Sequence, residues 1–117
     1  MNILNKSREN FTVKELYDLT KSPEIMKMST IAPAESELEI VDYIIYEDVN
    51  AKGEPQTIVC VKTADGELYA TNSPTFTREF KDVVDMCEAV GEQLHKIKPI
   101  EGTSKNGRKY ITCVYIG

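Results

Sequence analysis

A cluster of cationic and aromatic side chains lies near the end of the chain. Residues 102–110 read GTSKNGRKY and hold Lys105, Arg108, Lys109 and Tyr110. Ammonium and guanidinium groups bind phosphates, and a tyrosine ring can stack on an unpaired base. The Asn-Gly pair within the stretch predicts a tight hairpin turn with positive φ at both central residues. The stretch is therefore either a cationic binding finger or a hairpin tip kept soluble by its charges.

The distribution of charge sets this end of the chain apart. The 117 residues include 14 basic and 19 acidic side chains, a net charge of −5. Residues 93–117 hold five basic and one acidic side chain, a net of +4, whereas residues 1–92 have a net of −9. A protein whose cations gather at one end can bind a polyanion there despite its negative total.

Side chains that could carry out catalysis or hold a cofactor are few. His95 is the only histidine, no serine or cysteine lies in a nucleophile motif, and no glycine-rich phosphate loop is present. The three cysteines lie far apart without C-x-x-C spacing, which favours reduced thiols in the core. The acidic run at residues 35–48 is typical of a solvated surface. We therefore predict a protein that is not an enzyme and that binds no metal and no cofactor.

The composition is that of a soluble globular protein, with 41% hydrophobic and 28% charged residues. No apolar run approaches the roughly 18 residues of a membrane span. The first ten residues lack the apolar centre of a signal peptide. We expect a cytoplasmic protein without a membrane partner.

The first helix has a clear start in the sequence. Thr12 and Glu15 have the spacing of a capping box, and Phe11 and Leu16 have that of a hydrophobic staple. Pro23 limits the helix soon afterwards. The expected apolar face consists of Val13, Leu16, Tyr17 and Thr20. Such a face could close one end of a barrel or dock on a second subunit.

The chain then changes to a β pattern. β-branched and aromatic residues predict five strands, at residues 37–49, 56–63, 68–72, 95–101 and 108–116. Within the first of them the apolar residues change face midway, after Leu38 and Ile40. This change predicts a bent or bulged strand.

A second helix is expected between the third and fourth strands. Ser73 is its expected N-cap, proline follows at the first helical position, and the helix should end near Gly91. One apolar stripe runs along it, formed by Phe76, Phe80, Val83, Val84 and Cys87.

This order of elements predicts a mainly β protein with two helices. It matches a five-stranded Greek-key OB-fold barrel with a helix between strands three and four and an extra N-terminal helix. We expect one OB-fold domain over residues 1–117, with a helical extension at 1–36 and the barrel at 37–117. Such barrels bind oligonucleotides or oligosaccharides with strands two and three and with the loops 1–2 and 4–5. The cationic stretch would be loop 4–5.

Strand alternation adds candidate residues outside the last hairpin. If Val59 and Val61 face the core, Lys62 points outward, and if Leu68 points inward, Tyr69 points outward. Lys62 and Tyr69 would then share one binding face. The further candidates are Lys52, in the loop between the first two strands, and the ring of Tyr46.

The later part of the chain resembles a known family. The runs TFTREFKDVVDM, in the second helix, and IEGTSKNGRKYITCV, in the last hairpin, are similar to small single-stranded DNA-binding proteins of tailed phages. The resemblance covers roughly residues 37–117. It implies an OB-fold that coats replication intermediates without strong sequence preference, often as an oligomer. It supports strand contacts by Lys105, Arg108, Lys109 and Tyr110, and more weakly by Lys62 and Tyr69.

Two functions are therefore open at this stage. The leading hypothesis is a sequence-tolerant single-stranded DNA-binding protein acting in phage DNA replication or recombination, in the cytoplasm of the host bacterium. Its expected partners are single-stranded DNA, a further copy of the chain and replication proteins. The alternative is an OB-fold protein-interaction module, such as a phage factor that binds a host or replication protein.

Overall fold

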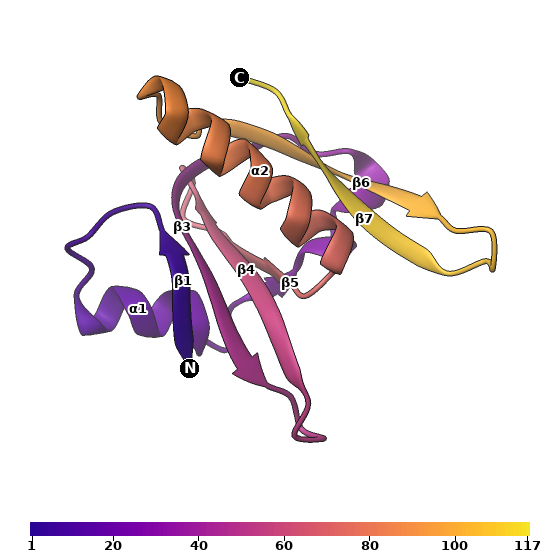
Figure 1. Ribbon diagram of the computed structural model, residues 1–117, viewed down its shortest axis with the longest axis horizontal. Coiled ribbons are helices and arrows are strands. Elements are labelled where there is room, and N and C mark those ends of the chain that lie inside the picture. Colours follow the sequence, from indigo (N-terminus) through magenta and orange to yellow (C-terminus); the bar gives the residue numbers. More distant parts are fainter.

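The structure, a computed structural model, describes residues 1–117 and is a curled, mainly antiparallel sheet with one long helix (Figure 1). The α-helices are α1 (Val13–Thr20) and α2 (Pro74–Val90), and two 3₁₀ turns are η1 (Met28–Thr30) and η2 (Ala32–Ala34). The strands are β1 (Asn2–Lys6), β2 (Met26–Lys27), β3 (Leu38–Val49), β4 (Pro55–Thr63), β5 (Leu68–Thr71), β6 (Lys96–Thr103) and β7 (Lys109–Tyr115). No helix is long and apolar enough to cross a membrane.

The long strand β3 organises the sheet, whose order is β2-β5-β4-β3-β6-β7 with β1 also paired to β3. The start of β3 pairs with β6, and most of its remaining length pairs with β4. Between Ile40 and Asp42 the register with β4 shifts, so that Val41 is an extra, half-exposed residue. The shift lets Ile40 and Tyr43 face the same core although they lie three residues apart. The predicted bulge is thereby confirmed.

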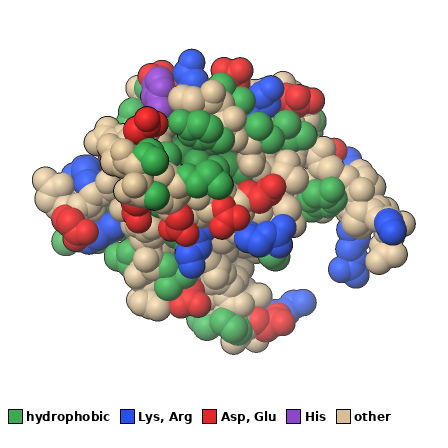
Figure 2. Space-filling model, turned by 45° about the horizontal axis from the view of Figure 1, so that its top comes forward, with side chains coloured by type: hydrophobic (Ala, Val, Ile, Leu, Met, Phe, Trp, Pro, Cys, Tyr) green, Lys and Arg blue, Asp and Glu red, His purple; other side chains and the backbone are tan.

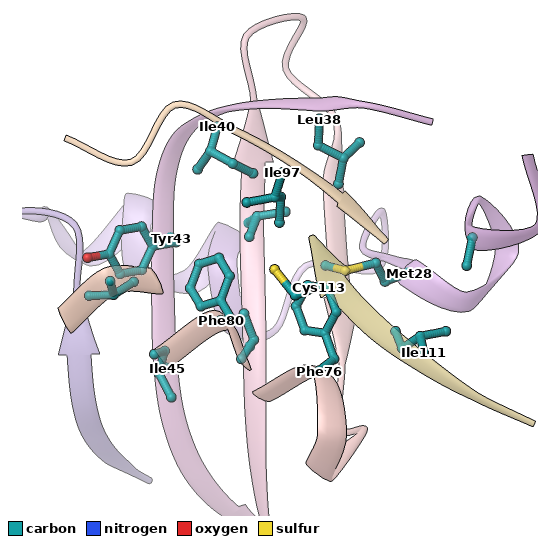
Figure 3. Close-up of a cluster of buried hydrophobic side chains, with 14 residues drawn as sticks. Met28, Leu38, Ile40, Tyr43, Ile45, Phe76, Phe80, Ile97, Ile111 and Cys113 are labelled. Atoms are coloured by element: carbon teal, nitrogen blue, oxygen red, sulfur yellow. The ribbon is translucent and has the colours of Figure 1, made fainter. Parts of the chain in front are cut away.

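The main core lies between α2 and the concave face of the sheet (Figure 3). The helix begins as predicted, with the Phe76 N–H donating to Ser73 Oγ, and ends at Gly91, whose φ is 74°. The rings of Phe76 and Phe80 stack with their centroids 5.9 Å apart, and Tyr43 meets Phe80 edge-on at 5.3 Å. The predicted stripe is confirmed for its buried members, which are Phe76, Phe80, Val84 and Cys87. All three cysteines are buried and free.

A second cluster lies on the opposite, outer face of the sheet, where α1 covers β3, β4 and β5. The capping box predicted for α1 is present. The predicted apolar face of this helix is wrong in part, because Val13 is 86% exposed and Leu19 is buried at 2%. The helix packs through Leu16 and Leu19, one helical turn apart, beside Phe11.

The strand count and the closure differ from the five-stranded barrel. The sheet has seven strands, because β1 and the two-residue β2 are added to the five that were predicted. No backbone ladder joins β5 to β7, so Greek-key closure is not confirmed and a seam remains. Ser73 Oγ donates to the Ile111 carbonyl oxygen across this seam at 3.3 Å. Met28 and Ala32, from η1 and η2, are fully buried in the main core.

The three hairpin loops share one turn geometry. In each, a glycine N–H donates to the carbonyl oxygen three residues earlier at 2.9 Å. The glycines are Gly53, Gly66 and Gly107, and all have positive φ. Asn106 does not, so the primed turn predicted there is wrong. The three-residue loop instead ends in a glycine bulge, a common alternative for hairpins.

Candidate nucleic-acid interface

The β6–β7 hairpin extends away from the rest of the molecule (Figure 1). Figure 2 shows it as an arm with Lys and Arg side chains near its end and a hollow beside it. The turn is held by the Arg108 N–H, which donates to Ser104 Oγ at 3.2 Å, and by the Ser104 N–H, which donates to the Arg108 carbonyl oxygen at 2.8 Å. The predicted residues Lys105, Arg108, Lys109 and Tyr110 therefore do lie together, all exposed.

The cations of the hairpin differ in whether a carboxylate pairs with them. Lys109 Nζ lies 3.5 Å from Glu101 Oε1. Lys105 and Arg108 form no ion pair. Because neighbouring residues of a strand point to opposite faces, Arg108 and Tyr110 lie on one face of the hairpin and Lys109 on the other. Lys109 shares its face with Ile111, which belongs to the main core.

Tyr110 is held against a glycine of the facing strand. Gly102 pairs with Tyr110 across the hairpin. A Cβ at position 102 would lie 2.6 Å from Tyr110 Cζ and 2.8 Å from its Oη. The phenol end of the ring therefore occupies the space that any side chain at 102 would need, while 38% of Tyr110 stays exposed. The sequence held a signal for this contact, because a glycine inside a strand often marks a close approach.

A groove of about 510 Å³ follows the seam beside the hairpin. It is lined by the junction of β5 and α2 at residues 71–74, by Ser29, and by the hairpin residues Glu101, Lys109, Tyr110 and Ile111. Its polar groups are hydroxyls, an amide and the Lys109–Glu101 pair. The ammonium in this groove already has a carboxylate beside it, which reduces its attraction for a phosphate.

The outer face of β4 and β5, where an OB-fold binds its ligands, is closed in this protein. Tyr46 is only 4% exposed and its hydroxyl donates to the Thr20 carbonyl oxygen at 3.4 Å. Burial raises the pKa of Tyr46 to about 12. No face of this ring is free to stack on a base, so Tyr46 is corrected from a candidate contact to a core residue.

Moving α1 away from the sheet would cost too much free energy for this helix to open and close as a lid. The second cluster holds five buried side chains: Leu19, Ile44, Tyr46, Cys60 and Leu68. Uncovering a buried side chain of this size costs roughly 1.5–3 kcal/mol, so uncovering the cluster costs on the order of 10 kcal/mol. That is comparable to the total stability of a small domain, about 5–15 kcal/mol. The burial of these side chains therefore favours the covered state of this face.

Lys62 and Tyr69 do not share a face, contrary to the prediction. The register of β4 with β5 pairs Lys62 with Leu68 and Val61 with Tyr69. Tyr69 therefore lies on the side of the main core, against which it packs, and Lys62 lies on the side that α1 covers. The prediction failed because it placed Leu68 in the main core, whereas Leu68 belongs to the second cluster.

Tyr69 also has acidic surroundings. Its hydroxyl donates to the Glu67 carboxylate at 3.0 Å. Burial raises the pKa of this hydroxyl, and the bond to Glu67 raises it further. The neighbouring cavity, of about 410 Å³, is lined by Glu37, Glu39 and Asp65 as well as Tyr69. A phosphodiester chain would be repelled from this cavity.

Lys52 lies on a different hairpin, the exposed turn between β3 and β4. Its N–H donates to Asn50 Oδ1 at 2.9 Å, which fixes the turn and leaves the ammonium free. This turn and the β6–β7 turn project from the body in different directions, with the junction of β5 and α2 between them (Figure 1). Lys52 is therefore separate from the cluster on the C-terminal hairpin.

Comparison with known proteins assigns the chain to a family. A family profile described as "Phage Single-stranded DNA-binding protein" matches residues 27–115. The chain belongs to this phage family. The matched range begins ten residues earlier than the predicted resemblance. This agrees with the burial of Met28 and Ala32 in the main core.

Two curated relatives of this family member carry the name "Single-stranded DNA-binding protein", from Bacillus phages PZA and phi29. Each is 26% identical to it over 73 residues, which is 62% of this chain and 59% of the relative. The chain thus spans less than two thirds of the length of these relatives. No solved structure matches it. The strand β1 and the covering helix α1 precede the matched range.

Proposed function

We propose that this phage-family protein binds single-stranded DNA without catalysis and without strong sequence preference, in phage DNA replication or recombination. The observation that carries the proposal is the β6–β7 hairpin, where unpaired cations stand beside a partly exposed ring. Lys105 and Arg108 meet phosphates and Tyr110 stacks on a base, whereas Lys109 is paired with Glu101 and is not part of the proposed site. The family match and the names of the two relatives support the same ligand.

The geometry favours single strands over duplex for a physical reason. A ring can stack only on a base whose face is free, and in a duplex both faces of a base are already stacked. Each stacked base contributes roughly 1–3 kcal/mol, whatever its identity. Cations that meet phosphates add attraction that does not depend on sequence and weakens with salt.

The test is a titration of a fluorescently labelled thymidine oligonucleotide with the protein, at low and at moderate salt. Duplex of the same length is the matched control. We expect tighter binding of the single strand and a linear fall of log affinity with log salt. Single-strand binding weaker than tens of micromolar at low salt would reject the proposal and favour the protein-interaction module. Equal affinity for the duplex would reject the proposed preference for single strands.

A further inference from the structure

The two faces of the C-terminal hairpin differ in charge. The β6–β7 register places Ile97, Pro99, Glu101 and Thr103 on one face and Lys98, Ile100 and Gly102 on the other. Near the body of the protein, the first face packs in the main core. Near the tip of the hairpin, it carries the Lys109–Glu101 ion pair. We call the second the outer face of the hairpin.

The outer face carries cations and no acidic side chain between Lys98 and the turn. Its residues in β6 are Lys98, Ile100 and Gly102, and those facing them in β7 and the turn are Val114, Thr112, Tyr110 and Arg108. Lys98 and Arg108 form no ion pair. The Thr112 hydroxyl donates to the Ile100 carbonyl oxygen at 3.3 Å, so the hydroxyl at the centre of this face already has a hydrogen-bond partner.

The cations lie on either side of the tyrosine ring along the hairpin. Lys98 is four residues from Gly102, roughly 13 Å at the ordinary rise of a strand, and Arg108 is two residues from Tyr110, roughly 7 Å. The ring lies over Gly102 and so stands between them. This arrangement is a row of cationic group, aromatic ring and cationic group on one surface.

We propose that the DNA strand follows this outer face, from Arg108 across Tyr110 to Lys98, and that Gly102 is the positioning residue that seats the ring. The inference rests on the proposed function and adds two residues to the site, Lys98 and Gly102. It also selects one side of the hairpin, since Lys109 lies on the opposite face with a carboxylate partner. The seam groove is then not the path of the strand.

The first test compares two lysines on opposite faces of the same hairpin. Lys98→Ala is expected to weaken binding of the labelled oligonucleotide by about three- to tenfold. It should also lower the salt slope by about 0.7, the value for one phosphate contact on a single strand. Lys109→Ala, the matched control, is expected to leave the slope nearly unchanged. An unchanged slope for Lys98→Ala, or a larger loss for Lys109→Ala, would overturn the proposed path.

The second test distinguishes the effect of Gly102 on the position of the Tyr110 ring from its effect on the stability of the hairpin. In Gly102→Ala the new Cβ must displace the end of the Tyr110 side chain, which can swing away. The substitution should leave the melting temperature unchanged or raise it, because alanine costs a strand less backbone entropy than glycine. We expect it nevertheless to weaken binding at least threefold.

A double-mutant cycle completes this test. If Gly102 acts only through the ring, Gly102→Ala should weaken binding no further in a Tyr110→Ala background. Full additivity of the two losses, or wild-type binding by Gly102→Ala, would reject the proposal that Gly102 positions the Tyr110 ring. Failure of the wild-type protein to bind the oligonucleotide rejects the proposed function itself. Normal wild-type binding with unaffected Lys98→Ala and Gly102→Ala variants rejects only the outer-face path.

Discussion

Two outer surfaces of the sheet differ in whether another part of the chain covers them. On β3, β4 and β5, the outward residues include Ile44 and Cys60, which are fully buried beneath α1. On β6 and β7, the outward residues include Lys98, Arg108 and Tyr110, and Tyr110 remains 38% exposed. The same alternation of side chains thus produces a sealed surface in one region and an open one in the other.

The difference shows that the position of a strand in a fold does not fix what its outer face does. An apolar outer face must be covered, and here the chain supplies its own cover in α1. A cationic outer face keeps its hydration until a polyanion replaces the water and counterions. The outer face of β4 and β5 is therefore structural in this protein, and we propose the hairpin as the binding surface.

The largest expected effect tests the sealed surface. Leu19→Ala removes a side chain that is 2% exposed and leaves a cavity between α1 and the sheet. It is expected to lower the free energy of unfolding by about 2–5 kcal/mol in a urea titration. Val13→Ala, on the exposed side of the same helix, should change it by less than about 0.5 kcal/mol. Equal effects of the two substitutions would show that α1 does not seal this face.

The next effect tests the open surface. Tyr110→Ala removes the ring while the hairpin ladder stays intact. Binding to the oligonucleotide should weaken by roughly 1–3 kcal/mol, or about five- to 150-fold, with little change in unfolding free energy. Tyr115→Ala, at the other end of β7, is the matched control and should bind as the wild type does. A loss confined to Tyr115→Ala would place the stacking site elsewhere.

The charge difference between the two regions is tested by paired substitutions. Lys105→Ala combined with Arg108→Ala should lower the salt slope of oligonucleotide binding by about 1.4, or 0.7 for each phosphate contact. The control, Lys14→Ala combined with Lys21→Ala, removes two cations that pair with Asp18 and Asp48. We expect the control to retain the wild-type slope. The same reduction in both double variants would mean that net charge alone governs binding.

A smaller effect concerns the corrected candidate Tyr46. Tyr46→Phe keeps the buried ring and removes one long hydrogen bond to the Thr20 carbonyl oxygen. The free energy of unfolding should fall by at most about 1 kcal/mol, and oligonucleotide affinity should not change. Weaker binding by a folded Tyr46→Phe variant would return this residue to the site and contradict the sealing of the face.

The smallest effect concerns the capping box that begins the covering helix. The N–H and hydroxyl of Thr12 together with Arg8 lower the pKa of Glu15 from 4.5 to about 2, with the Thr12 N–H as the main cause. A lowered pKa stabilises the fold above pH 4.5, and this contribution is lost as the pH falls towards 2. Glu15→Gln should therefore melt below the wild type at pH 7, with the difference narrowing between pH 4.5 and 2. A constant difference over this range would be the contrary result.

Local sequence signals predicted much of the fold. The Ser73 cap, Gly91 and the stripe from Phe76 to Cys87 define α2, because a helix is encoded by residues within a few positions of one another. The shift of apolar residues after Ile40 predicted the β3 bulge. The cluster of Lys105, Arg108 and Tyr110 was predicted as a unit because a hairpin turn keeps its neighbours together.

Other features depend on contacts between distant segments. The strand β1 has mostly polar residues, none of them buried, and exists through its pairing with β3 some forty residues later. The faces of Leu68 and Tyr69 follow from the register of β5 on β4, and one residue of register reverses both. No local pattern reports that α1 returns to cover Tyr46.

The sequence by itself thus determined the two α-helices, five of the seven strands, the positions of the hairpin turns and the end of the chain that is positively charged. Only the tertiary structure decided which face of each strand is covered, and hence which candidate residues remain available to a ligand. The physical reason is that periodicity identifies two faces of a strand but not what packs on them. Burial is a property of the whole chain, and in this protein it removes Tyr46 from the candidate site and leaves Tyr110 on the open surface.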